Sequence, residues 1–292
     1  MPTPKKILKR IDKFLSYLET TFLNQNEAPD WKQTLAYRWR KQEGRGYFHP
    51  INNLHQIRLK DLQGIQHQKT LCERNTVQFL RGKPANNILL WGSRGTGKSS
   101  LIKALLNQYA DKGLRLIEVD KQDLIDLPDI VETLQQEKYQ FIIFCDDLSF
   151  EQDDASYKAL KSILDGSLSA APDNVLIYAT SNRRHLMPEY MSDNLQSKHV
   201  EGELHHSEAI EEKISLSERF GIWLSFYPFK QDEYLEIVEY WLQELGLTEY
   251  DKTAMQAAAL QWALARGSRS GRSAWQFARD WAGQEIFLHS EC

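Results

Sequence analysis

The chain has 292 residues, 41% of them apolar and 26% charged, with a formal net charge of −4 at pH 7. This is the composition of a globular protein with room for one large or two modest domains, and its small negative charge gives no bulk attraction to nucleic acid. Its three cysteines form neither a zinc-binding spacing nor a disulfide framework, which favours a reducing cytoplasm. No apolar run reaches the length of about 18 residues that a membrane span needs, and charged residues interrupt the N-terminal apolar positions, unlike a secretory signal.

The first 50 residues are predicted to be helical and are locally basic. Apolar residues recur at helical spacing from Ile7 to Phe22, and a second helix is expected around Trp31 to Trp39. Ten Lys and Arg against five Asp and Glu give this stretch a local charge of +5. It could contact nucleic acid or an acidic partner, but the pattern favours a solvated helix face.

The clearest motif lies at residues 88–100. An apolar run from Ile88 to Trp91 enters a glycine-rich turn that ends in Lys98 and Ser99, and leucine and isoleucine then recur at helical spacing. This is G-x-x-x-x-G-K-[ST] between a strand and a helix. The glycines let backbone N–H groups face phosphate oxygens, the lysine supplies a charge for the β- and γ-phosphates, and the serine hydroxyl is placed to ligate Mg²⁺. The residues expected to hold the phosphates are Gly92, Ser93, Arg94, Gly95, Thr96, Gly97, Lys98, Ser99 and Ser100.

A chance match in a glycine-rich turn is the alternative, and the flanking strand and helix argue against it. Upstream, an apolar turn containing Gly64 and Ile65 could pack on a nucleotide base. By itself that turn is a weak signal.

Two acids follow a second apolar run. The continuous run from Phe141 to Cys145 is typical of a strand buried in a parallel sheet, whose carboxyl end faces the ligand. We therefore expect Asp146 to hold Mg²⁺ through water and Asp147 to polarise the attacking water as general base. An acidic loop or helix cap after a strand is the alternative.

Three further positions are candidates for the same site. A buried strand over residues 175–180 leads to Asn182, whose amide could hold the hydrolytic water or the γ-phosphate, although an ordinary turn explains it equally well. Arg219 precedes the last expected core strand, and helical patterns dominate from Gln231 onward. An arginine in the turn over residues 267–272 could reach the nucleotide. Residues 186–213 are polar, and a solvated loop or helix is favoured there over a metal site.

Together these motifs resemble an AAA+ ATPase. The resemblance covers about residues 57–290 and rests on the order of base-packing turn, P-loop, acidic strand, strand ending in Asn, arginine before the fifth strand, and helical lid. Three segments also resemble one bacterial AAA+ family described only as a domain of unknown function, whose N-terminal Trp-rich helices would correspond to Trp31 and Trp39. These segments are Trp-Gly-Ser-Arg-Gly-Thr-Gly-Lys-Ser-Ser at 91–100, Ala-Thr-Ser-Asn-Arg-Arg-His-Leu at 179–186 and Ser-Leu-Ser-Glu-Arg-Phe-Gly at 215–221.

The resemblance implies an α/β P-loop fold of AAA+ type with a five-stranded parallel core. Residues 1–56 would form an N-terminal helical segment, 57–229 the nucleotide-binding core and 230–292 a helical lid. It also implies roles for single residues. Asp146 and Asp147 would be the Walker B acids, Asn182 the sensor on the fourth strand, Arg219 an arginine finger inserted into a neighbouring subunit, and Arg272, or else Arg269, the lid sensor.

The implied function is binding and hydrolysis of ATP with Mg²⁺ by a homo-oligomer, a ring or spiral, that acts as a conformational switch on an unidentified macromolecular client. Most AAA+ proteins have Glu as the second Walker B acid, so the shorter Asp147 leaves the rate of hydrolysis open. The alternatives are a nucleic-acid-associated loader or initiator, and a scaffold that binds ATP with little turnover. A small-molecule kinase accounts less well for the Arg219 segment and the lid together.

Overall fold

The computed structural model describes residues 28–150, 154–165, 172–182 and 216–290. The helix expected within residues 7–22 and the polar stretch 186–213 lie outside the described residues. The helices in the described part of the chain are all too short or too polar to cross a bilayer.

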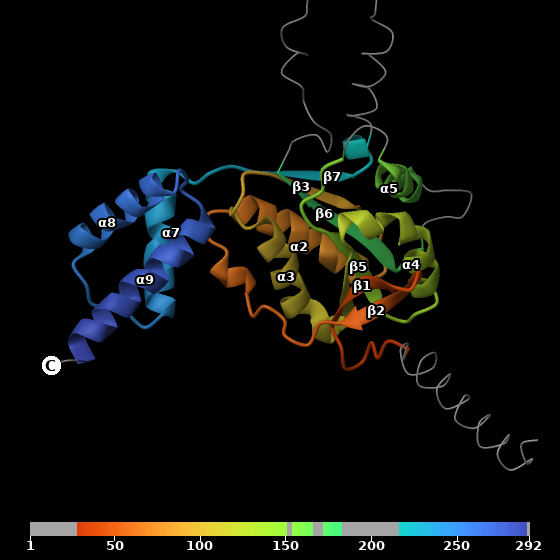
Figure 1. Ribbon diagram of the computed structural model, residues 1–292, viewed down its shortest axis with the longest axis horizontal. Helices are drawn as coiled ribbons and strands as arrows, with labels where there is room; N and C mark the ends of the chain where they lie inside the picture. Colours follow the sequence, from red (N-terminus) through yellow and green to blue (C-terminus); the bar gives the residue numbers. More distant parts are fainter. Residues whose placement is uncertain (1–27, 151–153, 166–171, 183–215, 291–292) are drawn as a thin grey trace, which may run out of the picture.

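A seven-stranded sheet forms the centre of the molecule (Figure 1), in the order β2-β1-β4-β5-β6-β3-β7. All neighbouring strands run parallel except β1 and β2. The α/β P-loop architecture expected from the sequence is confirmed, with seven strands in place of five. The strands are β1 (Ala36–Gln42), β2 (Arg45–Pro50), β3 (Ile88–Gly92), β4 (Leu114–Glu118), β5 (Gln140–Cys145), β6 (Val175–Ser181) and β7 (Ile222–Phe226).

Helices cover both faces of the sheet, so the inner strands alternate between two hydrophobic cores. In β3, Ile88 and Leu90 face the core under α2 and α3, whereas Leu89 faces the core under α4 and α5. The covering helices are α2 (Gln66–Leu80), α3 (Lys98–Tyr109), α4 (Leu127–Leu134) and α5 (Ala155–Asp165). Short 3-10 turns join them: η2 (Leu59–Asp61), η3 (Ala110–Lys112) and η4 (Lys121–Asp126).

The helix expected around Trp31 to Trp39 is wrong, because β1 and β2 form a hairpin there. The local period is two: Tyr37 and Trp39 are buried, whereas Arg40 is exposed. The hairpin turns at Glu43 and Gly44, which both have positive φ (51° and 79°), as a two-residue loop of this kind requires. The hairpin therefore extends the sheet beside β4, and this part of the expected N-terminal helical segment is strand.

After β7 the chain leaves the sheet and forms a group of three helices, the lid, to the left of the sheet in Figure 1. They are α7 (Gln231–Glu244), α8 (Lys252–Ala265) and α9 (Gly271–Ser290). Asp251 caps the start of α8 by accepting hydrogen bonds from the backbone N–H groups of Thr253 and Ala254. The core of the lid is continuous with the core under α2 and α3, so the lid packs against one side of the sheet domain.

Candidate nucleotide-binding site

The glycine-rich turn joins β3 directly to α3 at the carboxyl edge of the sheet. Gly92 has φ of 128°, and a Cβ there would lie 2.0 Å from the backbone oxygen of Phe226. Gly97, which precedes the first residue of α3, has φ of 101°. Both positions therefore require glycine. The loop from Arg94 to Ser100 lines a cavity of about 950 Å³, whereas Gly92 and Ser93 lie behind it and do not line it.

Lys98 begins α3 and is only 6% exposed. Its Nζ donates hydrogen bonds to the backbone oxygens of Gly92 and Ser93, both at 2.8 Å, and lies 3.3 Å from Oδ1 of Asn182. Burial lowers the pKa of this ammonium to about 8, and the nearby carboxylates of Asp146 and Asp147 oppose the change. The lysine is thus a partly dehydrated cation at the wall of the cavity, held there by neutral carbonyl groups.

Asp146 lies immediately after β5, between two hydroxyl groups. Ser99 Oγ and Thr180 Oγ1 lie 2.6 Å and 2.5 Å from its Oδ1. Ser99 comes from the first turn of α3 and Thr180 from β6, so three elements meet at this carboxylate. Carboxylate and hydroxyl oxygens are ligands that Mg²⁺ accepts, and the expected metal-ligating pair is therefore together.

Asp147 has φ of 52°, an unfavourable conformation for a residue other than glycine. Its N–H donates to Oγ1 of Thr180 at 2.9 Å, which holds the turn against β6. Asn182 Nδ2 donates to the Asp147 carboxylate while Asn182 Oδ1 faces Lys98. The structure thus brings the expected base and the expected sensor into direct contact.

The other end of the cavity is apolar and is formed by both the core and the lid. Ile65 lines it as expected, but Gly64 does not: a Cβ there would lie 2.8 Å from the ring of Phe229. Sequence reasoning missed the lid's share of this wall. These missed residues are Ile237, Trp241, Leu245 and Trp275. Their helical spacing identified a lid but could not separate the cavity wall from the lid core.

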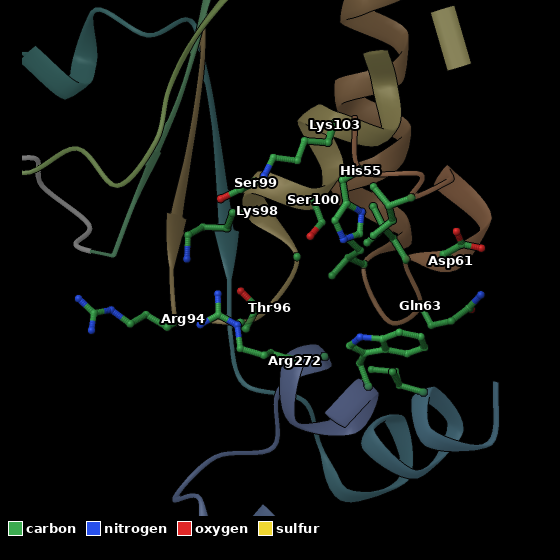
Figure 2. Close-up of a pocket in the computed structure, with 18 of the residues that line it drawn as sticks. His55, Asp61, Gln63, Arg94, Thr96, Lys98, Ser99, Ser100, Lys103 and Arg272 are labelled. Atoms are coloured by element: carbon green, nitrogen blue, oxygen red, sulfur yellow. The ribbon is translucent and has the colours of Figure 1, made fainter. Parts of the chain in front are cut away.

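Arg272 is the lid arginine at the cavity. Its backbone N–H donates to the oxygen of Gly95 at 3.2 Å, and Figure 2 shows its side chain passing Thr96 toward Lys98. Arg269 does not line the cavity, because its Nε faces the backbone oxygen of Phe229 at 3.3 Å. Of the two candidates, Arg272 is therefore the one placed to reach a ligand on the P-loop.

Arg219 lies away from the cavity of its own chain. Its guanidinium forms an ion pair with Asp165 at the end of α5. A role in this chain's own site is not supported, and its expected role in a neighbouring subunit stays a prediction.

Comparisons with known proteins agree with the fold described above. The family described as "Protein of unknown function (DUF815)" matches residues 32–285. The chain belongs to this family. The DUF815 match includes the β1–β2 hairpin as well as the core and most of the lid. A search of curated proteins finds no match.

Solved structures show the fold of this DUF815 protein. A variant of Thermotoga maritima RuvB has a TM-score of 0.52 and 16% identity, covering 77% of this chain and 64% of that chain. A second RuvB variant gives 0.51 and 15% with the same coverage. Aeropyrum pernix ORC1 in complex with DNA gives 0.49 and 17%, covering 73% and 58%. The chain thus spans less than two thirds of the RuvB variants and has the AAA+ type of P-loop fold.

Proposed function

We propose that this DUF815 protein binds ATP with Mg²⁺ in the cavity and hydrolyses it, acting as an oligomeric conformational switch on an unidentified macromolecular client. The observation that supports this proposal is the meeting of Lys98, Ser99, Asp146, Asp147 and Asn182 at one end of a single cavity. The residues proposed to supply the charge, the metal ligands and the general base for phosphoryl chemistry thus lie in contact with one another.

The residues present fit magnesium and a triphosphate. Ser99 and Asp146 would hold the metal, because their hard oxygen atoms already lie 2.6 Å apart. Lys98 would hold the β- and γ-phosphates, since the hydrogen bonds that the structure gives its ammonium go to neutral carbonyl oxygens, which a phosphate can replace. When bound, magnesium supplies charge neutralisation on the phosphates.

The chain's own groups account for the remaining chemistry. Asp147 would accept a proton from water attacking the γ-phosphorus as ADP departs, and Asn182 would orient that water. Arg272 would place a positive charge beside the phosphates from the lid, and Arg219 would do so from the next subunit. Asn182 contacts Asp147 directly, so the amide that orients the water would lie beside the base that accepts its proton.

The first experiment compares ATP binding by the wild type, Lys98→Ala and Asp147→Asn. Lys98→Ala should weaken binding by about 10- to 150-fold, because charge-assisted hydrogen bonds to the phosphates are lost. Asp147→Asn should bind normally but release no phosphate. Lys112→Ala, an exposed lysine beyond the end of α3, is the matched control and should behave as wild type.

Three results would change the proposal. Wild-type protein that does not bind ATP would refute it altogether. If the wild type binds ATP but releases no phosphate in any assembly state, and Asp147→Asn behaves in the same way, the ATP-binding scaffold would be favoured. A nucleic-acid loader has weaker support, because Arg38 and Lys41 of the basic N-terminal stretch are paired with Glu118 and Asp126.

A further inference from the structure

A polar cluster joins the sheet domain to the lid beside the apolar end of the cavity. We call it the lid latch: Arg58, which precedes the η2 turn, and Lys60 and Asp61 within it, with Tyr240 and Glu244 from α7. Arg58, Asp61 and Glu244 also line the cavity. The latch is thus both a wall of the candidate site and a connection between its two halves.

Asp61 is the centre of the latch and is only 5% exposed. Its Oδ1 accepts hydrogen bonds from Tyr240 Oη at 2.6 Å and Arg58 Nη2 at 2.8 Å, and its Oδ2 accepts one from the Arg58 backbone N–H at 2.7 Å. Burial alone would raise the pKa of this carboxyl, but the hydrogen bonds from Arg58 and Tyr240 outweigh it and hold the pKa below its ordinary value. A buried carboxylate with this many donors keeps a definite geometry.

The outer half of the latch is weaker. Glu244 pairs with Lys60 at 3.0 Å and with Arg58, but Lys60 and Arg58 are at least half exposed. Exposed ion pairs of this kind contribute little because water screens them. The partly buried hydrogen bond between Asp61 and Tyr240 is therefore the more specific of these connections between η2 and the lid.

From Tyr240 the connection continues to the P-loop through packed rings. The next residue on α7, Trp241, packs against Trp275 of α9, with ring centroids 4.5 Å apart. Arg272 lies about one helical turn before Trp275, and its backbone N–H contacts Gly95. A shift of α7 relative to η2 would therefore move the arginine that faces the phosphates.

The other end of the η2 segment is tied to the P-loop helix. Nδ2 of Asn107 in α3 donates to the backbone oxygens of His55 and Ile57, both at 2.8 Å. Figure 2 draws His55 and Asp61, the two ends of this segment, among the residues that line the cavity. The segment 55–61 is thus held to the core at one end and to the lid at the other.

We propose that Asp61 and Tyr240 are positioning residues that hold the lid so that Arg272 faces the β- and γ-phosphates of a bound nucleotide. This inference rests on the proposed function. A positioning role differs from a simple stabilising contact, because loss of the Asp61–Tyr240 bond should change the position of Arg272 through α7 and α9.

The test uses Tyr240→Phe, which removes one hydroxyl and leaves the ring. The variant should weaken ATP binding about fivefold, and AMP binding less than about twofold, because AMP lacks the phosphates that Arg272 would reach. In an Arg272→Ala background Tyr240→Phe should have no further effect on ATP, since coupled residues are not additive. Tyr250→Phe is the matched control, because Tyr250 lies in the lid between α7 and α8 and does not line the cavity.

Two outcomes would overturn the proposal: equal weakening of ATP and AMP, or additive effects of Tyr240→Phe and Arg272→Ala. A separate measurement needs no nucleotide. Hydrogen exchange in ligand-free Tyr240→Phe should become faster in η2 and at the start of α9, but not in Tyr250→Phe. If the wild type binds neither ATP nor AMP, the proposed function fails. Hydrogen exchange in Tyr240→Phe still tests the lid latch, and exchange equal to that of the wild type would overturn it.

Discussion

Single residues set the electrostatics of the P-loop. Lys98 is buried among carbonyl oxygens, and the pKa of its ammonium falls to about 8 chiefly because burial disfavours the charged form. Asp147 occupies a left-handed conformation that costs about 1–3 kcal/mol for a residue with a side chain. Such positions persist where the surroundings hold them, here through Thr180 and Asn182.

Nucleotide binding should therefore take up a proton at alkaline pH. Above about pH 8 Lys98 is largely neutral in the free protein, and a bound triphosphate would raise its pKa again and recharge it. Affinity should then fall as pH rises through this pKa. Calorimetry at about pH 9, in two buffers of different ionisation enthalpy, should show uptake of about one proton, and almost none near pH 7. No uptake at the higher pH would mean that Lys98 is already charged in the free protein.

Whole elements depend on contacts that lie outside their own residues. The β1–β2 hairpin is held by aromatic packing: Trp31 lies against Tyr37, Phe48 and Phe141, with ring centroids 4.7, 5.3 and 4.9 Å away. Trp39 donates its Nε1–H to Asp126 at 2.9 Å, and its ring covers Gly46. A glycine beneath an aromatic ring is a feature of sheets, not of helices.

The substitution Gly46→Ala tests the hairpin through the sign of its effect. A Cβ at residue 46 would lie 1.9 Å from Cζ2 of Trp39, so overpacking should lower the free energy of unfolding by about 1–3 kcal/mol. In a helix the same change would raise it by up to about 1 kcal/mol. Gly283→Ala in α9, where nothing lies within 4 Å of the new Cβ, is the helical control and should stabilise. Urea unfolding measures both, and a stabilising Gly46→Ala would contradict the hairpin.

The sheet domain and the lid together form a site that contains every residue to which the proposed function gives a chemical role, except Arg219. That arginine is paired with Asp165 within its own chain, away from the cavity. Assembly with heterologous contacts would have to exchange this pair for a neighbour's phosphate group.

Mixing variants tests whether Arg219 acts in a neighbouring subunit. Arg219→Ala should bind ATP normally and lose about a thousandfold or more of its turnover. Asp147→Asn is also inactive but supplies an intact Arg219, so an equal mixture of the two should recover roughly a quarter of wild-type turnover. The control replaces Asp147→Asn by the double variant Asp147→Asn/Arg219→Ala, which should give no recovery. Two results would contradict an arginine finger that acts in a neighbouring subunit: no recovery of turnover in the mixture of Arg219→Ala with Asp147→Asn, or full turnover of Arg219→Ala alone.

Local patterns in the amino-acid sequence were sufficient to predict the P-loop strand and helix, the acidic strand, Asn182 at a strand end and the C-terminal helices. These features follow from local requirements: glycine where φ is positive, an apolar run where a strand is buried on both faces, and a helical period where one face is covered. The order of these motifs along the chain was enough to predict the α/β P-loop architecture.

The other features depend on contacts between distant parts of the folded chain. A period of two over a few residues is too short to distinguish the β1–β2 hairpin from a helix. The contact of Trp31 with Phe141 and the pairing of β1 with β4 place this segment in the sheet. The choice of Arg272 over Arg269 depends on how α9 meets Gly95. Asp61 and Tyr240 are 179 residues apart, and no local pattern relates them. Their hydrogen bond exists because folding closes that loop and excludes water from the carboxylate, which is a property of the whole packed molecule.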